Sequence, residues 1–206
     1  MNPRRILLVL LVALLASSPG CAWLKRLAYA GSDRDEWQQP DRVVSSLGLA
    51  ADALVADLGA GGGYFTFRLA DAVKDGRVYA VDIDPAMTDF IASKAKEDGY
   101  ANVSVVQAGA DDARLPEPVD WVFTSNTFHH LPDQATYFAR LKSHLKPGGR
   151  VAVVEYAPRQ GWSLLGDHAT SKDEIVSALT EAGYRLDADY SFLDRQSFLV
   201  FAVDEG

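Results

Sequence analysis

The sequence predicts an α/β domain: a mainly parallel sheet of seven strands, covered by helices on both faces and ending in an antiparallel hairpin. Two patterns predict it. Between residues 53 and 183, short apolar segments alternate with amphipathic ones, as in successive βαβ units. Two further β segments then follow, with only Asp194 and Arg195 between them, and so short a connection joins antiparallel strands. Together these patterns describe a doubly wound, Rossmann-like fold.

The N-terminal segment has the pattern of an export signal. Arg4 and Arg5 precede an uninterrupted apolar stretch at residues 6–16, and Ser-Ser-Pro-Gly-Cys follows. The apolar stretch is too short to span a bilayer. The segment resembles a bacterial lipoprotein signal, in which Cys21 is lipidated and becomes the first mature residue, although Ser18-Pro19 departs from the usual aliphatic and small pair. Ordinary secretion or a retained N-terminal anchor is the alternative.

The expected organisation is a signal peptide at residues 1–21, a tether at 22–32 and one domain at 33–206. The chain is 48% hydrophobic and 23% charged, enough for one sizeable core. Its formal net charge of −8 argues against nucleic acid as a partner. We expect a membrane-anchored lipoprotein on the periplasmic side of the cell envelope, attached through Cys21, with a secreted or soluble periplasmic protein as the alternative. The oligomeric state is not predicted.

The expected elements of the domain follow the chain in order. A leading helix within residues 33–49 is interrupted by Pro40. Strands are expected at 53–56, 77–81, 103–107, 119–124 and 150–156, and helices at 66–73, 85–98, 134–145 and after Ser171. Asp84 before Pro85 is interpreted as a helix N-cap, and Ser171 with Glu174 as a capping box. The last two β segments are expected at 184–193 and 196–203.

The stretch that organises the domain connects the first strand to the next helix. The strand segment ends at Asp57, and glycines follow at positions 59, 61 and 63. Glycine is needed there because the turn takes backbone angles that a Cβ resists, and because the main chain must approach a ligand closely. Strand, glycine turn and helix form the first half of a nucleotide-binding βαβ unit.

The glycine spacing discriminates between nucleotide ligands. A dinucleotide fingerprint needs glycine or alanine where this chain has Tyr64. The pattern present is Asp57-x-Gly59-x-Gly61-x-Gly63, followed by Asp82 at the end of the next strand segment. It resembles motif I and the following acidic position of class I S-adenosylmethionine (SAM) dependent methyltransferases. The antiparallel strand at the end of the sheet is a further resemblance to this family.

The resemblance implies SAM as the cofactor and methyl transfer as the activity. It implies that Asp57 and Ala60 bind the cofactor, that the glycine backbone holds the methionine part of SAM and that Asp82 binds the ribose hydroxyls. Asp111 is expected at the adenine amine, because it stands four residues before Leu115-Pro116, as the family's acid does. Asp112, or a simple helix cap at this position, is the alternative.

The segment after the fourth strand contains the second group of candidates. Asn126 falls beyond a strand's carboxyl end, where ligands bind in open α/β sheets, and we count it among the cofactor-binding residues. The Asn/Asp-Pro-Pro-aromatic signature of enzymes that methylate amide or base nitrogens is absent here. His129-His130-Leu131-x-Asp133 instead resembles small-molecule methyltransferases of the ubiquinone/menaquinone-biosynthesis type. A small-molecule acceptor is therefore expected.

Four residues are candidates for a catalytic base, namely His129, His130, His168 and Glu155. Packing or capping is the alternative for the first two, and a structural ion pair for Glu155. His144 is expected to face solvent. No metal site is expected, because four scattered histidines and one terminal cysteine form no ligand cluster.

Two segments are expected to cover the site. The patch at residues 34–40 resembles a segment before motif I that covers the cofactor pocket in some small methyltransferases, and a solvated charged turn is the alternative. The irregular loop at 158–167 is a candidate substrate lid.

The predicted location conflicts with the predicted cofactor, because SAM is made in the cytoplasm. A non-catalytic, methyltransferase-fold binding protein of the cell envelope is therefore the alternative function. An aminopropyltransferase or other SAM-fold transferase, and an NAD oxidoreductase, are further alternatives.

Overall fold

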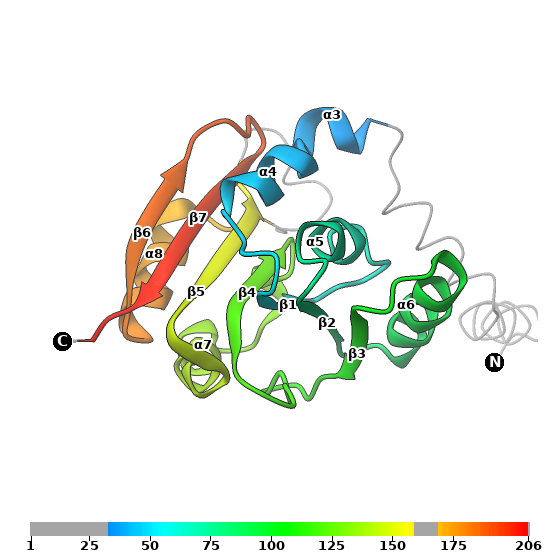
Figure 1. The fold of residues 1–206 in the computed structure, drawn as a ribbon. Helices are drawn as coiled ribbons and strands as arrows, with labels where there is room; N and C mark the ends of the chain where they lie inside the picture. The colour runs from blue at the N-terminus through cyan, green and yellow to red at the C-terminus, as the bar shows by residue number, and fades with distance from the viewer. Residues whose placement is uncertain (1–32, 159–168, 206) are drawn as a thin grey trace, which may run out of the picture. The chain divides into compact units, whose positions relative to one another are not determined.

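The computed structural model describes residues 33–158 and 169–205. They form a seven-stranded sheet with the strand order β3-β2-β1-β4-β5-β7-β6 (Figure 1). Strands β1 to β5 are parallel, and β7 runs antiparallel to both of its neighbours. The strands are β1 (Leu54–Leu58), β2 (Arg77–Asp82), β3 (Val103–Gln107), β4 (Val119–Ser125), β5 (Leu145–Tyr156), β6 (Tyr184–Tyr190) and β7 (Gln196–Val203).

Helices pack on both faces of the sheet (Figure 1). Alternating residues of β5 illustrate the two layers, because Ala152 and Val154 pack with α4 and α5 while Val151 and Val153 pack with α7 and α8. The helices are α3 (Arg34–Gln38), α4 (Pro40–Ser46), α5 (Thr66–Ala72), α6 (Pro85–Asp98), α7 (Gln134–Leu141) and α8 (Lys172–Glu181), with 3-10 turns η1 (Phe128–His130) and η2 (Lys142–His144). Within the described ranges, no helix is both long and apolar enough to cross a bilayer.

The topology places the functional residues at one edge of the sheet. The parallel strands β1, β2, β4 and β5 all end at this edge, and the antiparallel β7 begins there, since Tyr156 is in register with Gln196. We call it the carboxyl edge. Ligands of open α/β sheets bind beyond the carboxyl ends of the strands.

The predicted alternation of strands and helices is confirmed, and so are the local stop and start signals. Asp84 caps α6 by accepting a hydrogen bond from Ala86 N at 2.9 Å, and Gly99 ends that helix with a φ of 80°. Ser171 and Glu174 form the predicted capping box at α8.

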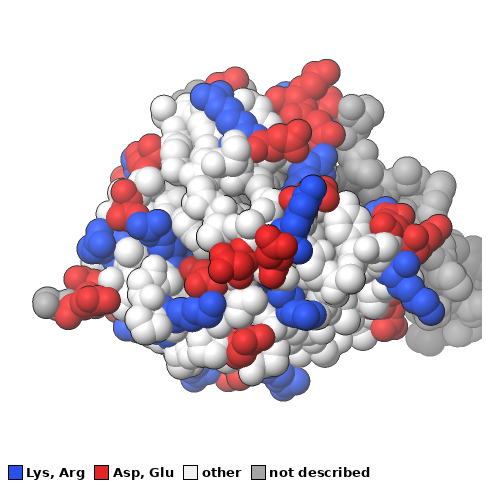
Figure 2. Space-filling model, viewed as in Figure 1, with Lys and Arg blue, Asp and Glu red and all other residues white. Residues whose placement is uncertain are grey.

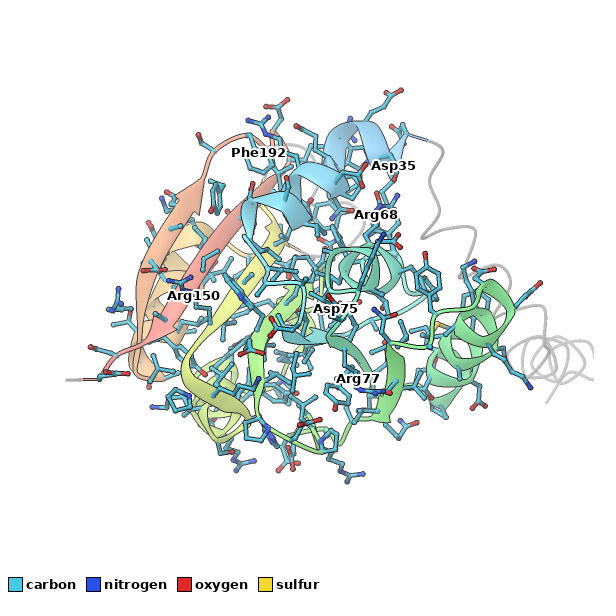
Figure 3. All side chains as sticks on the ribbon, in the orientation of Figure 1. Asp35, Arg68, Asp75, Arg77, Arg150 and Phe192 are labelled. Atoms are coloured by element: carbon cyan, nitrogen blue, oxygen red, sulfur yellow. The ribbon has the colours of Figure 1, made fainter. Side chains whose placement is uncertain are left out.

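The predicted hairpin connection is wrong in length. Strand β6 ends at Tyr190, so residues 191–195 join the strands rather than Asp194 and Arg195 alone. Phe192 leaves the strand because it packs against α4: its carbonyl accepts a hydrogen bond from Gln39 Nε2 at 2.9 Å, and the Arg42 guanidinium lies 4.0 Å from its ring centroid (Figure 3).

Strand β5 begins earlier than predicted. It starts at Leu145, so the expected turn at residues 146–149 lies inside it as an irregularity in the pairing with β4. Gly148 takes a φ of 77° there, which explains the glycine. The helix expected at 134–145 accordingly ends at Leu141 and tightens into the 3-10 turn η2.

Candidate cofactor and acceptor site

The loop between β1 and α5 is held in place by the neighbouring strand and by its own ends. The backbone N–H groups of Gly59 and Ala60 both donate to Val81 O, at 2.8 and 3.0 Å. Asp57 is 3% exposed and accepts a hydrogen bond from Thr66 Oγ1 at 2.6 Å. Asp57 therefore ties the end of β1 to the start of α5, and its contact with the cofactor stays a prediction.

The loop's glycines have two different roles. Gly59, Gly61 and Gly63 have φ values of 75°, 54° and 79°, which side chains rarely adopt. A Cβ at Gly59 would lie 2.1 Å from Thr127 Oγ1, so this glycine also allows the loop after β4 to pack against the glycine loop. A Cβ at Gly61 or Gly62 would meet no side chain within 4 Å. The surface above Gly61 and Gly62 is thus open to a ligand.

Asp82 lies at the end of β2 and braces this loop. Its Oδ2 accepts a hydrogen bond from Gly61 N at 2.7 Å, and its Oδ1 accepts one from Asp84 N at 2.9 Å. An ionised carboxylate offers about four lone-pair sites, so about two stay available for the ribose hydroxyls. The open glycine surface beside this half-buried carboxylate fits SAM.

The predicted adenine loop starts beside Asp82, because Ala108 N donates to Asp82 O at 2.9 Å. Asp111 itself is 72% exposed and pairs with Arg140 of α7, whose guanidinium nitrogen lies 2.7 Å from its Oδ2. This ion pair ties the Asp111 carboxylate to the last turn of α7. Its contact with adenine stays a prediction.

Asp112 contacts His144, and the expectation that His144 faces solvent is wrong. The histidine side chain is 22% exposed, and its Nε2 lies 3.0 Å from Asp112 Oδ1. The pKa of Asp112 is lowered, chiefly because its carboxylate accepts a hydrogen bond from Arg114 N and also because His144 is adjacent. This pairing keeps the imidazole against the loop.

Asn126 follows β4 and turns its side chain along the carboxyl edge. Its φ of 55° is left-handed, a conformation that asparagine tolerates. Its Oδ1 accepts a hydrogen bond from Gln196 Nε2 at 2.6 Å, and its N–H donates to Val154 O at 2.9 Å. The structure thus brings Asn126 to β5 and β7, on the acceptor side of the glycine loop, and its predicted cofactor contact stays a prediction.

His129 and Glu155 are brought together at the ends of β4 and β5. The Glu155 side chain is fully buried, and its Oε1 accepts a hydrogen bond from Tyr156 N at 2.8 Å. His129 Nδ1 lies 3.1 Å from Glu155 Oε2, and the histidine side chain is 11% exposed. The buried carboxylate therefore orients this imidazole.

The other histidine candidates differ from His129. His130 is exposed, and its ring centroid lies 4.0 Å from that of His129. His168 and most of the expected lid lie outside the described residues. In residues 33–158 and 169–205, no cluster of three or more His, Cys, Asp or Glu side chains could hold a metal ion.

Helix α3 packs against the glycine loop and the end of β4, and its covering of a cofactor pocket stays a prediction. Asp35 accepts a hydrogen bond from Tyr64 Oη in the glycine loop and lies 3.1 Å from an Arg68 guanidinium nitrogen of α5 (Figure 3). Gln38 is fully buried and donates to Ser125 Oγ at 3.1 Å. Sequence reasoning missed Gln38, because a glutamine in a charged patch gives no signal of burial.

The seven-stranded fold and the glycine loop with Asp82 resemble those of class I SAM-dependent methyltransferases. Residues 55–149 match the protein-family model described as Methyltransferase domain. The structure resembles that of a SAM-dependent methyltransferase from Aquifex aeolicus, with a TM-score of 0.79, 24% sequence identity and coverage of 87% of this chain and 97% of the other.

Curated relatives share the same part of the chain but differ in their acceptors. A tRNA U34 carboxymethyltransferase from Cellvibrio japonicus is 30% identical over 149 residues, covering 69% of this chain and 44% of the relative. The ubiquinone/menaquinone biosynthesis C-methyltransferase UbiE from Proteus mirabilis is 30% identical over 118 residues, covering 56% and 47%. The chain spans about half the length of these relatives. The comparisons therefore support a methyltransferase domain, and they do not identify the methyl acceptor.

Proposed function

We propose that this chain is a methyltransferase that transfers the methyl group of SAM to a small-molecule acceptor. The observation that carries the proposal is the Asp82 carboxylate, which braces the glycine loop beside the open surface above Gly61 and Gly62. A turn kept only for structure would need neither the open surface nor an ionisable group with lone pairs to spare.

When bound, SAM supplies a methyl group on a positively charged sulfur, which is already a good leaving group. The protein's contribution is then to orient the two reactants. Such positioning lowers the activation barrier by several kcal/mol, and by roughly 7–11 kcal/mol in the best cases. In this proposal the glycine backbone holds the methionine part and Asp82 the ribose. Asp111 would contact adenine.

His129 is the proposed general base, and Glu155 positions it. Because Nδ1 faces the Glu155 carboxylate at 3.1 Å, Nε2 is the nitrogen that would exchange a proton with the acceptor. The fully buried carboxylate would hold the imidazole in this orientation while the acceptor loses its proton to Nε2. His130, which is exposed, is a weaker candidate.

A small molecule is the proposed acceptor for two reasons. The His-His-Leu segment resembles small-molecule methyltransferases, and the relative from Proteus mirabilis is named for quinone biosynthesis. Acidic and basic side chains are also interspersed on the face shown in Figure 2, without the basic stripe expected for binding a nucleic-acid backbone.

Transfer of labelled methyl from SAM tests this proposal. Folded wild-type protein is incubated with small-molecule extract or with tRNA, and an Asp82→Ala variant is the control. We expect label in the small-molecule fraction that depends on Asp82. Label in tRNA would refute the acceptor class, and no label despite SAM binding would favour a non-catalytic binding protein.

We also propose attachment to the cell envelope through lipidated Cys21, which rests on the sequence pattern of residues 4–21 alone. A Cys21→Ser variant is expected to move from the membrane fraction to the soluble fraction or to stay as an unprocessed precursor. Membrane fractionation with mass spectrometry of the mature N-terminus checks this. An unmodified Cys21 in the mature wild-type protein would refute the anchor.

A further inference from the structure

An arginine lies at the carboxyl edge, beside the proposed acceptor site. Arg195 immediately precedes β7, and its carbonyl accepts a hydrogen bond from Ala157 N at 3.1 Å, directly after β5. The next residue, Gln196, is in register with Tyr156 and bonded to Asn126. Arg195 is therefore fixed at the strand ends where Asn126 and Glu155 also lie.

Aromatic side chains hold the Arg195 guanidinium. Its Cζ lies 5.4 Å from the ring centroid of Trp37, and that ring lies 5.8 Å from the ring of Tyr156. Cations over aromatic faces are stabilised by the ring quadrupole, and a guanidinium in this position keeps N–H donors with which it can bind an anion. Helix α3 and the end of β5 thus form an aromatic wall for this cation.

The charge of Arg195 is not balanced by an acid of the described chain. No carboxylate among residues 33–158 and 169–205 lies within 4.0 Å of its side-chain nitrogens, whereas Arg140 and Arg150 each have one. The chain carries 28 acidic and 20 basic residues, so acidic side chains outnumber basic ones, yet none of those described pairs with Arg195. Within the described part of the chain, a ligand carboxylate would therefore meet no competing acid at this guanidinium.

The neighbouring Gln196 adds a second observation that points to a ligand. This side chain is 4% exposed, and its Oε1 has no hydrogen-bond partner in the described residues, while its Nε2 donates to Asn126. Burying an acceptor without a partner costs about 1–3 kcal/mol, so a ligand O–H or N–H at this atom would be stabilising. Arg195 and Gln196 together offer a cationic donor and a neutral acceptor.

We infer that the acceptor is a small organic acid whose carboxylate pairs with Arg195, beside Trp37 and Tyr156, while a second polar group of the acid donates to Gln196 Oε1. This inference rests on the proposed function, because it assigns the acceptor of the same site. The guanidinium fork suits the two oxygens of a carboxylate, and the aromatic wall suits a planar, partly apolar body.

The test compares matched acids and amides on the full-length protein. Benzoate and 4-hydroxybenzoate are titrated against benzamide and 4-hydroxybenzamide by heteronuclear NMR, with the Arg195 Nε–Hε signal assigned from its loss in an Arg195→Gln variant. We expect the acids to shift this signal and to bind at least tenfold more tightly than the amides. Arg195→Gln should remove that preference, and Arg195→Lys should keep part of it.

Arg185→Gln is the matched control. Arg185 is in register with Ala202, at the opposite end of β7 from Gln196, and it pairs with Asp187. The control removes the same charge and is expected to leave the preference for acids unchanged. Equal loss in both variants would show a general charge effect and overturn the inference, as would equal binding of acids and amides by the wild type.

A separate titration with SAM tests the proposed methyltransferase function independently of the proposed acceptor. Arg195→Gln is expected to bind SAM like the wild type, because the glycine loop and Asp82 are unchanged. If the wild type binds SAM but does not prefer acids to amides, the proposed carboxylate site at Arg195 is overturned and the methyltransferase proposal stays intact. Absence of SAM binding by the folded wild type would overturn the proposed function itself.

Discussion

Replacing Gly59 by alanine is expected to destabilise the protein strongly and to abolish SAM binding. The new Cβ would lie 2.1 Å from Thr127 Oγ1 and 2.7 Å from Thr127 Cβ, and the backbone φ is 75°. Left-handed strain costs about 1–2 kcal/mol and overpacking about 1–3 kcal/mol, so the loss is about 2–5 kcal/mol. At roughly 2–4 °C per kcal/mol, Tm should fall by roughly 4–20 °C.

Gly62→Ala is the matched control, because it adds the same methyl group to the same loop. Gly62 has no positive φ, and a Cβ there meets no atom within 4 Å. Its Tm is expected to stay within about 2 °C of the wild type, as for most exposed substitutions. Thermal denaturation of both variants checks the contrast, and equal Tm values would show that Thr127 does not pack on the loop as described.

His129→Gln is expected to lower kcat by about 10²–10⁴-fold with little change in SAM affinity, because general-base catalysis contributes about this much. The glutamine keeps a polar side chain of similar size but cannot take the proton. Initial rates with the acceptor found in the methyl-transfer assay give kcat and KM, and calorimetry gives the affinity for SAM.

His130→Gln is the control for this prediction, since His130 is the adjacent, exposed histidine. It should retain most of the wild-type kcat. Glu155→Gln should lower kcat while leaving KM for the acceptor nearly unchanged, because Glu155 acts through His129 rather than on the acceptor. A His130→Gln variant as impaired as His129→Gln, or an unimpaired His129→Gln variant, would remove His129 from the role of base.

Local sequence signals predicted most of the fold. Apolar periodicity placed the strands and helices, and Asp84 and Ser171 marked helix starts, because a cap depends only on residues within one turn. The glycine loop was equally readable, since its backbone requirements are local. The predicted two-residue hairpin turn failed because Phe192 packs on α4, a contact across 153 residues from Gln39 that no local pattern encodes.

The acceptor side of the site was less predictable for the same reason. Gln38 meets Ser125 across 87 residues, and Asn126 meets Gln196 across 70. Single polar residues have no periodicity, so their burial depends on how α3 and β7 fold onto β4. Likewise, Arg195 was interpreted as part of a turn, because only the folded chain places it over Trp37.

The measurement that tests the central claim most directly is calorimetric titration of the folded, full-length protein with SAM and with its demethylated product. We predict micromolar binding of both. Asp82→Ala should weaken it at least tenfold, about 1.4 kcal/mol. Asp84→Ala should leave the affinity unchanged, because it keeps the N–H that bonds Asp82 and loses only a helix cap worth about 1 kcal/mol. No detectable binding of either compound by folded wild-type protein would contradict the account.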